Sequence, residues 1–487
     1  MSSNLKKNIL YQTTYQVLAI LLPLVISPYV SRVLGAENLG KYTYSVSIAE
    51  YFVLFAMLGI NNYGNRVIAT NRDDKSKLDE SFSSIFILHF GVATFFAIVY
   101  FVYAFIFSNS STLSIIQGLY VLSSIIDVNW FYFGIEKFKQ TVARNALIKI
   151  ITVVSVFIFV NDVNDIYIYT LIMTVSPLLG NILMFFYLPK YTKLVKTNWR
   201  DIIKHMKPLL ILFVPVVAIS LYKIMDRIML GIIVPKVQLG YYSNSEKAIN
   251  IPISVIGAFG TVMLPRMSNM LKDGINSESR KYVDSSIKYI MMIALPLAFG
   301  LAAVSSCFAT VFWGNEFVYC GRLIKCLSSS IPFLALANII RTQLLIPLKK
   351  DRQYTVSVFL GAAVNVVVNL MLIPKYYALG AAIGTVLAET TVCVTQAVYI
   401  MKEFNVLGSI KKCFSSVVFS LVMYICISLI ASKMKYNVIT LIVQILIGAI
   451  VYSFLCIIYL WRTKDQMFDV IISAMKRLLL FRKRNVC

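Results

Sequence analysis

Five basic side chains lie deep inside long apolar stretches of the chain. They are Lys149, Lys223, Arg227, Lys247 and Arg341. A charged group that faces lipid is strongly disfavoured, so we expect these side chains to face a water-filled cavity or one another. Arg and Lys neutralise phosphate oxygens, and a low dielectric strengthens each contact. The pattern therefore predicts a cationic cavity that suits an anionic headgroup such as a diphosphate.

Arg32, at the end of the first apolar stretch, joins this predicted set. Structural ion pairing between helices is the alternative, because acidic residues lie in the same stretches. Lys223 and Asp226, three residues apart on one helix face, are the pair most open to that interpretation.

Four acidic side chains in the apolar stretches are candidates for coupling to a proton or a cation. They are Glu50, Asp127, Asp226 and Glu389. Nothing in their spacing arranges them as a catalytic acid and base. We therefore expect a protein that is not an enzyme and has no catalytic residues.

Signals for a nucleotide, a metal or another cofactor are weak. Gly35, Gly40 and Lys41 nearly match a phosphate-binding loop, but Tyr42 takes the Ser/Thr position and no strand precedes it. The chain has two histidines far apart, and its eight cysteines include no C-x-x-C pair. We expect no metal and no cofactor.

A polar face marks the beginning of the first apolar stretch. Its members follow i, i+4 spacing and are Tyr11, Gln12, Tyr15 and Gln16. Such groups hydrogen-bond to sugars or stack on them, which makes these residues candidates for sugar contact. A polar seam between helices would show the same pattern, so both interpretations stay open.

The composition indicates which elements must position these side chains. The 487 residues are 59% hydrophobic and only 14% charged, whereas soluble proteins have about 45–50% apolar and about 25% charged residues. A net charge of +24 would suggest a nucleic-acid partner for a soluble chain. The mean hydropathy of +0.76 favours a bilayer instead, and we expect no nucleic acid.

The apolar runs predict an all-α membrane protein, because a membrane helix needs about 20 apolar residues. We expect fourteen spans, at 9–34, 42–62, 84–107, 113–135, 143–160, 166–188, 208–234, 241–264, 287–313, 323–347, 354–374, 378–401, 412–431 and 438–461.

Basic residues are sorted between the two sides of these spans. The N-terminus and the connections after even-numbered spans, together with the span ends beside them, hold 32 Lys and Arg residues, and the opposite connections with their span ends hold eight. By the positive-inside rule, both termini are expected in the cytoplasm. The most basic inner connection, Lys190 to Lys207, follows span 6 and suggests a join between two halves.

Short matches between the halves indicate an internal repeat. Leu39-Gly40 and Leu239-Gly240 each follow a proline-interrupted helix in what we expect to be equivalent turns, and residues 136–142 match 350–356. Parallel repeats of this kind predict two six-helix lobes and alternating access. We expect an N-terminal lobe at 1–200, a C-terminal lobe at 201–402, and spans 13 and 14 at 403–464.

The last two spans and the tail lie outside this repeat. Spans 13 and 14 carry no charge within their apolar runs, which suits either a groove for a lipid tail or simple packing of extra helices. Residues 465–487 alternate apolar and basic side chains, which predicts an amphipathic helix on anionic membrane lipids; a disordered basic tail is the alternative.

The first 70 residues carry a family resemblance. Residues 28–42, Tyr51-Phe52, Leu58 to Ile60 and Asn62 to Ala69 resemble the polysaccharide repeat-unit flippases (Wzx type). These belong to the multidrug/oligosaccharidyl-lipid/polysaccharide exporter superfamily, and length, span number and the repeat extend the resemblance over the whole chain. Arg32 and Arg66 stand in the matching motifs, which makes both candidates for substrate binding, although Arg66 suits an anionic lipid equally well.

The resemblance implies a function in the bacterial cell membrane. It implies movement of an undecaprenyl-diphosphate-linked oligosaccharide to the outer leaflet, for capsule, O-antigen or exopolysaccharide assembly. The implied cycle rocks from inward to outward and can be coupled to an ion. Implied partners are membrane lipids, a polysaccharide polymerase and the chain-length machinery.

Two other functions compete with this one. A cation-coupled exporter of small drugs from the same superfamily would favour an acidic or apolar cavity. A membrane polymerase or ligase would need a sizeable external loop for its catalytic groups, whereas the outer connections here are short.

Overall fold

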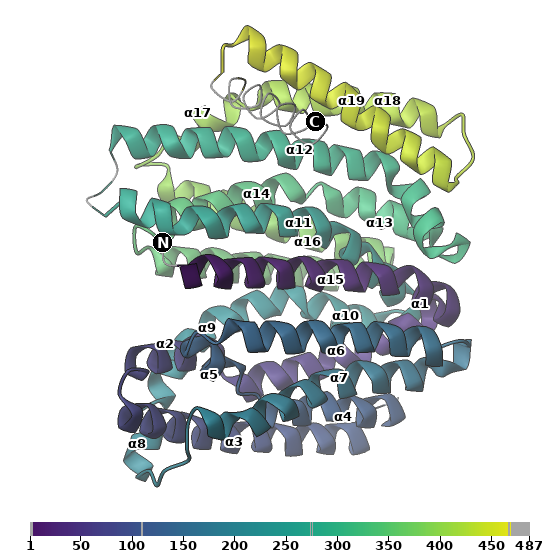
Figure 1. Ribbon diagram of the computed structural model, residues 1–487. Coiled ribbons are helices and arrows are strands. Elements are labelled where there is room, and N and C mark those ends of the chain that lie inside the picture. Colours follow the sequence, from purple (N-terminus) through teal and green to yellow (C-terminus); the bar gives the residue numbers. More distant parts are fainter. Residues whose placement is uncertain (1–2, 109–110, 273, 275, 466–467, 469–487) are drawn as a thin grey trace, which may run out of the picture. The chain divides into compact units, whose positions relative to one another are not determined.

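The computed structural model describes residues 3–108, 111–272, 274, 276–465 and 468, together with all their side chains except those of residues 3–23, 138–140 and 222. The described residues form helices and contain no strand (Figure 1). The expected all-α fold is confirmed. The predicted tail at 465–487 lies almost wholly outside the described residues.

The helices follow one another with short connections. Their bounds are α1 Ser3–Met57, α2 Ile60–Asn71, α3 Lys75–Ile106, α4 Ser111–Ile125, α5 Asn129–Gly134, α6 Phe138–Phe159, α7 Ile166–Tyr187, α8 Trp199–Ile203, α9 Met206–Lys223, α10 Met225–Ile233, α11 Lys236–Met270, α12 Ser277–Trp313, α13 Val318–Ser328, α14 Ile331–Ile339, a π-helix Ile340–Leu345, α15 Asp351–Tyr376, α16 Ala378–Ile400, α17 Val406–Lys411, α18 Phe414–Ala431 and α19 Val438–Arg462.

Thirteen helical segments of the described part are long and apolar enough to cross a membrane. They account for the fourteen expected spans because spans 1 and 2 run together. Gly35 kinks α1 with φ 74° and ψ 172°, a backbone conformation that favours glycine. The backbone N–H of Ala36, just past the kink, donates to Glu316 Oε1 at 2.9 Å.

The two matching Leu-Gly pairs lie in helices, so the equivalent turns that we expected there are wrong. Instead, α1 and α11 cross at these glycines. A Cβ on Gly40 would lie 1.7 Å from the carbonyl oxygen of Lys236, and a Cβ on Gly240 would lie 2.0 Å from that of Ala36. Each glycine therefore meets the residue four positions before its counterpart. Only a residue without a side chain permits so close an approach.

The described residues group into two compact units. The first comprises residues up to 251 with 312–323 and 355–392, and the second comprises 252–311, 324–354 and the residues from 393 onward. The lobes at 1–200 and 201–402, which rest on the internal repeat, remain a prediction.

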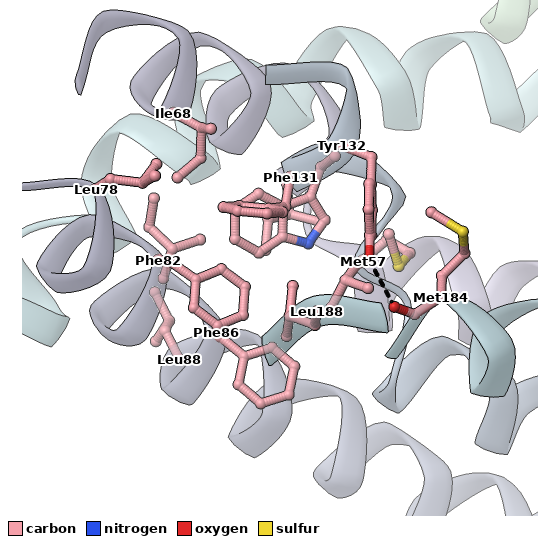
Figure 2. Packing of buried hydrophobic residues seen from close by; sticks show 14 of the residues in the cluster. Met57, Ile68, Leu78, Phe82, Phe86, Leu88, Phe131, Tyr132, Met184 and Leu188 are labelled. Atoms are coloured by element: carbon pink, nitrogen blue, oxygen red, sulfur yellow. Dashed lines mark hydrogen bonds between the residues drawn. The ribbon is translucent and has the colours of Figure 1, made fainter. Parts of the chain in front are cut away.

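An aromatic core lies within the first unit (Figure 2). It forms where the fourth span breaks between α4 and α5, which inserts Trp130, Phe131 and Tyr132 among α2, α3 and α7. The Tyr132 hydroxyl donates to the backbone oxygen of Met184 at 2.8 Å. Phe82 meets Phe131 edge to face, with ring centroids 5.0 Å apart.

In the second unit, the hairpin of α18 and α19 packs on α12. Val304, Met423 and Ile427 form the buried contact, and the Tyr452 hydroxyl donates to Met292 O at 2.7 Å. The opposite faces of the hairpin expose large apolar side chains such as Ile450. The two extra helices thus pack against α12, and their exposed faces suit contact with lipid.

Candidate substrate-binding site

A cavity of about 310 Å³ lies in the first unit among α1, α6, α7, α10 and α11. It brings together three of the predicted cations, Lys149, Arg227 and Lys247, with two acids, Glu50 and Glu246. The lining therefore carries one more positive than negative charge. Tyr42 and Tyr169 add aromatic surface to its wall, with ring centroids 4.8 Å apart.

Arg227 is the centre of an ion cluster in this cavity. Its Nε donates to Glu246 Oε2 at 2.8 Å, and its Nη1 lies 3.5 Å from Glu50 Oε2. The three side chains remain between a fifth and a third exposed, so each offers charged surface to a ligand in the cavity. The sequence pattern makes Glu50 an ion-coupling candidate, and in the structure it lies beside the guanidinium of Arg227.

Lys247 meets a neutral group instead. Its Nζ donates to Asn244 Oδ1 at 2.8 Å, and Asn244 Nδ2 in turn donates to the Ser31 hydroxyl at 2.8 Å. This chain ties α11 to α1 on the wall of the cavity. Lys149 enters from α6.

The other four predicted cations lie outside the lining of this cavity. Arg32 and Lys223 are exposed. Arg66 lines a separate crevice with Lys207. Arg341 lies in the second unit, with its guanidinium 5.8 Å from the centre of the Tyr354 ring.

No ion pair joins Lys223 and Asp226 among the described residues. Lys223 is exposed, whereas Asp226 is buried and accepts hydrogen bonds from neutral side chains.

Asp226 is buried in a network of neutral donors. Its Oδ2 accepts from the hydroxyls of Tyr242 at 2.8 Å and Thr385 at 2.7 Å, and its Oδ1 accepts from Asn369 Nδ2 at 2.5 Å. Asn369 Nδ2 also lies 3.2 Å from Asn365 Oδ1. Only 1% of Asp226 is exposed. Glu389, on α16, is buried as well.

Asp127 lines a second cavity of about 410 Å³ among α4, α5, α6 and α7. Sequence reasoning missed most of its polar lining, which includes Asn129, Arg144, Asn145 and Asn181. A detectable signal was present on α6, where Asn145 and Lys149 are four residues apart and share a helix face with Thr152. The side chains of the sugar-contact candidates Tyr11, Gln12, Tyr15 and Gln16 lie outside the described part.

The chain resembles proteins of polysaccharide export. It is 21% identical over 392 residues to a Shigella dysenteriae protein named "Putative O-antigen transporter", an alignment that covers 80% of this chain and 98% of that protein. It is 23% identical over 389 residues to capsular polysaccharide biosynthesis protein CapF of Staphylococcus aureus, covering 79% and 96% of the two chains.

A solved structure shares the fold. Lipid II flippase MurJ, in an inward closed conformation, superposes with a TM-score of 0.76 at 15% identity, covering 94% of this chain and 100% of that one. The family model described as "Polysaccharide biosynthesis protein" matches residues 5–271. The resemblance to the polysaccharide repeat-unit flippases is thus confirmed, and because the family model matches more than half of the chain, the protein belongs to the polysaccharide biosynthesis protein family.

Proposed function

We propose that the protein translocates an undecaprenyl-diphosphate-linked oligosaccharide across the bacterial cell membrane, for capsule, O-antigen or exopolysaccharide assembly. The observation that carries this proposal is the convergence of Lys149, Arg227 and Lys247 on one cavity among membrane helices. The names of the Shigella and Staphylococcus relatives and the shared fold support it. The protein acts as a transporter and not as an enzyme.

In this proposal the diphosphate binds by replacing the carboxylates as the partner of Arg227. Glu50 and Glu246 neutralise Arg227 while the cavity is empty. A diphosphate brings several anionic oxygens, which the planar guanidinium can bind in bidentate fashion, and Lys149 and Lys247 add point charges. The carboxylates compensate the charge of Arg227 in this state, because an unpaired guanidinium would be costly away from bulk water.

Alternating access requires the crossing of α1 and α11 to open. Besides the two close glycines, the Thr43 hydroxyl donates to the Ser243 hydroxyl at 3.3 Å in this crossing. Thr43 and Ser243 also line the cationic cavity. We assign this contact to the gate at one end of the cavity. The lobes at 1–200 and 201–402 would then move against each other.

Among the ion-coupling candidates we favour Asp226. It lies directly before Arg227 in α10, so a proton or cation bound at Asp226 can shift the helix that carries the central arginine. Its partners are all uncharged, which leaves its charge open to compensation by an ion. Glu50 is engaged with Arg227 instead.

The proposed orientation places both termini in the cytoplasm, with 32 basic residues on the inner side and eight on the outer. Arg32, Arg66, Lys223 and Arg341 remain predicted contacts for other stages of the cycle. A polysaccharide polymerase and the chain-length machinery would receive the translocated unit.

The test is a leaflet-accessibility assay in proteoliposomes with defined lipid-linked saccharides. We expect the purified protein to expose the saccharide on the opposite leaflet faster than empty liposomes do. Absence of this acceleration, together with transport of cationic drugs, would favour the small-molecule exporter instead.

A further inference from the structure

The second cavity of the first unit occupies a break in a membrane span. The break runs from the end of α4 at Ile125 to the start of α5 at Asn129. Within a bilayer, non-helical backbone is tolerated only where it is buried in protein or lines a water-filled cavity. The break is therefore a built feature of the span, and its carbonyl groups need partners.

Side chains from three other places in the chain supply these partners. His89 Nε2 lies 2.8 Å from Ser124 O, and Asn181 Nδ2 donates to Ser123 O at 2.8 Å. Trp130 Nε1 donates to Asp127 O at 3.1 Å. The broken backbone is thus held in place from α3, α5 and α7.

Two of the three charged groups that line this cavity, Asp127 and Arg144, are also held by neighbours; the third, Lys149, lines the cationic cavity as well. Asp127 Oδ1 accepts from the backbone N–H and the side-chain amide of Asn129, at 2.9 and 2.7 Å. Arg144 donates to Gly180 O at 2.6 Å and to Asn129 Oδ1 at 2.8 Å. These contacts join α4, α5, α6 and α7 into a rigid polar wall.

Two polar groups on the lining are not used by this framework. Within the part of the chain that the structure describes, the Tyr120 hydroxyl and the Asn145 side-chain amide make no hydrogen bond. Both side chains are partly exposed. They offer one hydroxyl and one amide to a ligand, beside the carboxylate of Asp127.

Size and chemistry suit a sugar better than a diphosphate. The cavity of about 410 Å³ is within the range of small-molecule sites. Its neutral amides and hydroxyls both donate and accept, as the hydroxyls of a saccharide do. Its guanidinium is already engaged with protein oxygens.

The cavity also adjoins the cationic one. Lys149, Thr152 and Met173 line both. We propose that the second cavity is a saccharide subsite, which binds a hydroxyl-rich sugar of a substrate whose diphosphate lies in the cationic cavity. This inference rests on the proposed function. It assigns to Tyr120 and Asn145 a role in sugar specificity that the residues of the diphosphate site do not have.

The test compares two lipids on the full-length protein in nanodiscs. One is undecaprenyl diphosphate that carries an oligosaccharide, and the other is undecaprenyl diphosphate alone. In the double variant Tyr120→Phe with Asn145→Ala, we expect affinity for the glycosylated lipid to fall roughly 10- to 100-fold, because two hydrogen bonds are lost. Affinity for the bare lipid should not change.

Controls separate the subsite from general damage. Tyr167→Phe, a matched change at an exposed position of α7, should alter neither affinity. Asn145→Phe, which fills the cavity, should exclude the glycosylated lipid while the bare lipid still binds. Free oligosaccharide should compete weakly with the glycosylated lipid on the unsubstituted protein, which distinguishes an attached sugar from a soluble one.

The outcomes are distinguishable. If the double variant loses both lipids equally or loses neither, the subsite is wrong. If the unsubstituted protein binds both lipids with equal affinity, the subsite is wrong and the proposed function stands. If it binds neither lipid, the proposed function itself fails.

Discussion

Two adjacent residues of α10, Asp226 and Arg227, belong to two polar networks that are built from different groups. Arg227 lies in an accessible cavity between two carboxylates, Glu246 and Glu50. Asp226 is almost fully buried, and its hydrogen-bond donors in the described part of the chain are neutral side chains. Successive residues of a helix point about 100° apart, which separates the two environments.

The difference indicates two tasks. An accessible cation with exchangeable anionic partners can release them to an incoming anion. A buried carboxylate with fixed neutral partners has its geometry set in advance, and only its charge can vary. We expect substitutions in the first network to affect substrate binding, and substitutions in the second to affect stability and ion dependence.

The largest effect should come from the Arg227 network. Replacing Lys149, Arg227 and Lys247 together by Gln should abolish translocation, because no positive charge would be left to neutralise the carboxylates or a diphosphate. Arg227→Gln alone should lower it about 10- to 100-fold, the value of one charge-assisted contact. Polymer export in cells with equal expression measures both.

A matched control for these variants is Arg72→Gln. Arg72 also pairs with an acid, since its Nη1 lies 2.5 Å from Glu136 Oε1, but it lies outside both cavities. Export should be normal in this variant. Normal export in the triple variant would refute the cationic site.

The next largest effect should come from cross-linking the proposed gate, the contact between Thr43 and Ser243. In a background free of native cysteines, Thr43→Cys with Ser243→Cys should form a disulfide, because the native hydroxyls are 3.3 Å apart. Transport should stop on oxidation and return on reduction, since the cationic cavity must open while the Asp226 network need not. Full transport by the oxidised protein would exclude this gate.

Two substitutions of Asp226 should have different effects on stability. Asp226→Ala leaves three buried donors without their acceptor, so we expect a lower thermal unfolding temperature, at a cost of about 1–3 kcal/mol per unsatisfied group. Asp226→Asn retains most of the shape and should fold normally.

The Asp226→Asn variant should bind substrate as before. Its transport should no longer depend on imposed proton or sodium gradients. Glu246→Gln, in the other network, is the contrasting variant: it should keep that dependence and alter substrate affinity. If Asp226→Asn responds to both gradients as the unsubstituted protein does, Asp226 is not the coupling group.

The smallest effects should follow at Arg32 and Arg341. Both lie outside the lining of the cationic cavity, and Arg341 is beside an aromatic ring. We expect Gln at either position to reduce export by about two- to fivefold, less than one full charge-assisted contact. A loss as large as that of Arg227→Gln would show that the cavity described is not the main binding stage.

The α-helical class and the positions of the spans could be predicted because long apolar runs leave a membrane chain few alternatives. The break at Asp127 could not, since the run from Ser111 to Gly134 reads as one span. Its stability depends on Asn181 and His89, which are distant in sequence. The same holds for Gly40 and Gly240, whose short motif looked like a turn and instead permits two helices to cross.

The sequence by itself determined that charges lie within apolar spans, and that these charges are mostly basic. It also determined the family, through short motifs in the first 70 residues. Only the tertiary structure decided which charges meet. Lys149 and Arg227 come from helices far apart in the chain, and they line the same cavity only because of the face that each helix turns inward. That choice is made by packing, through contacts such as the α1–α11 crossing, and packing between distant helices leaves no local pattern to read.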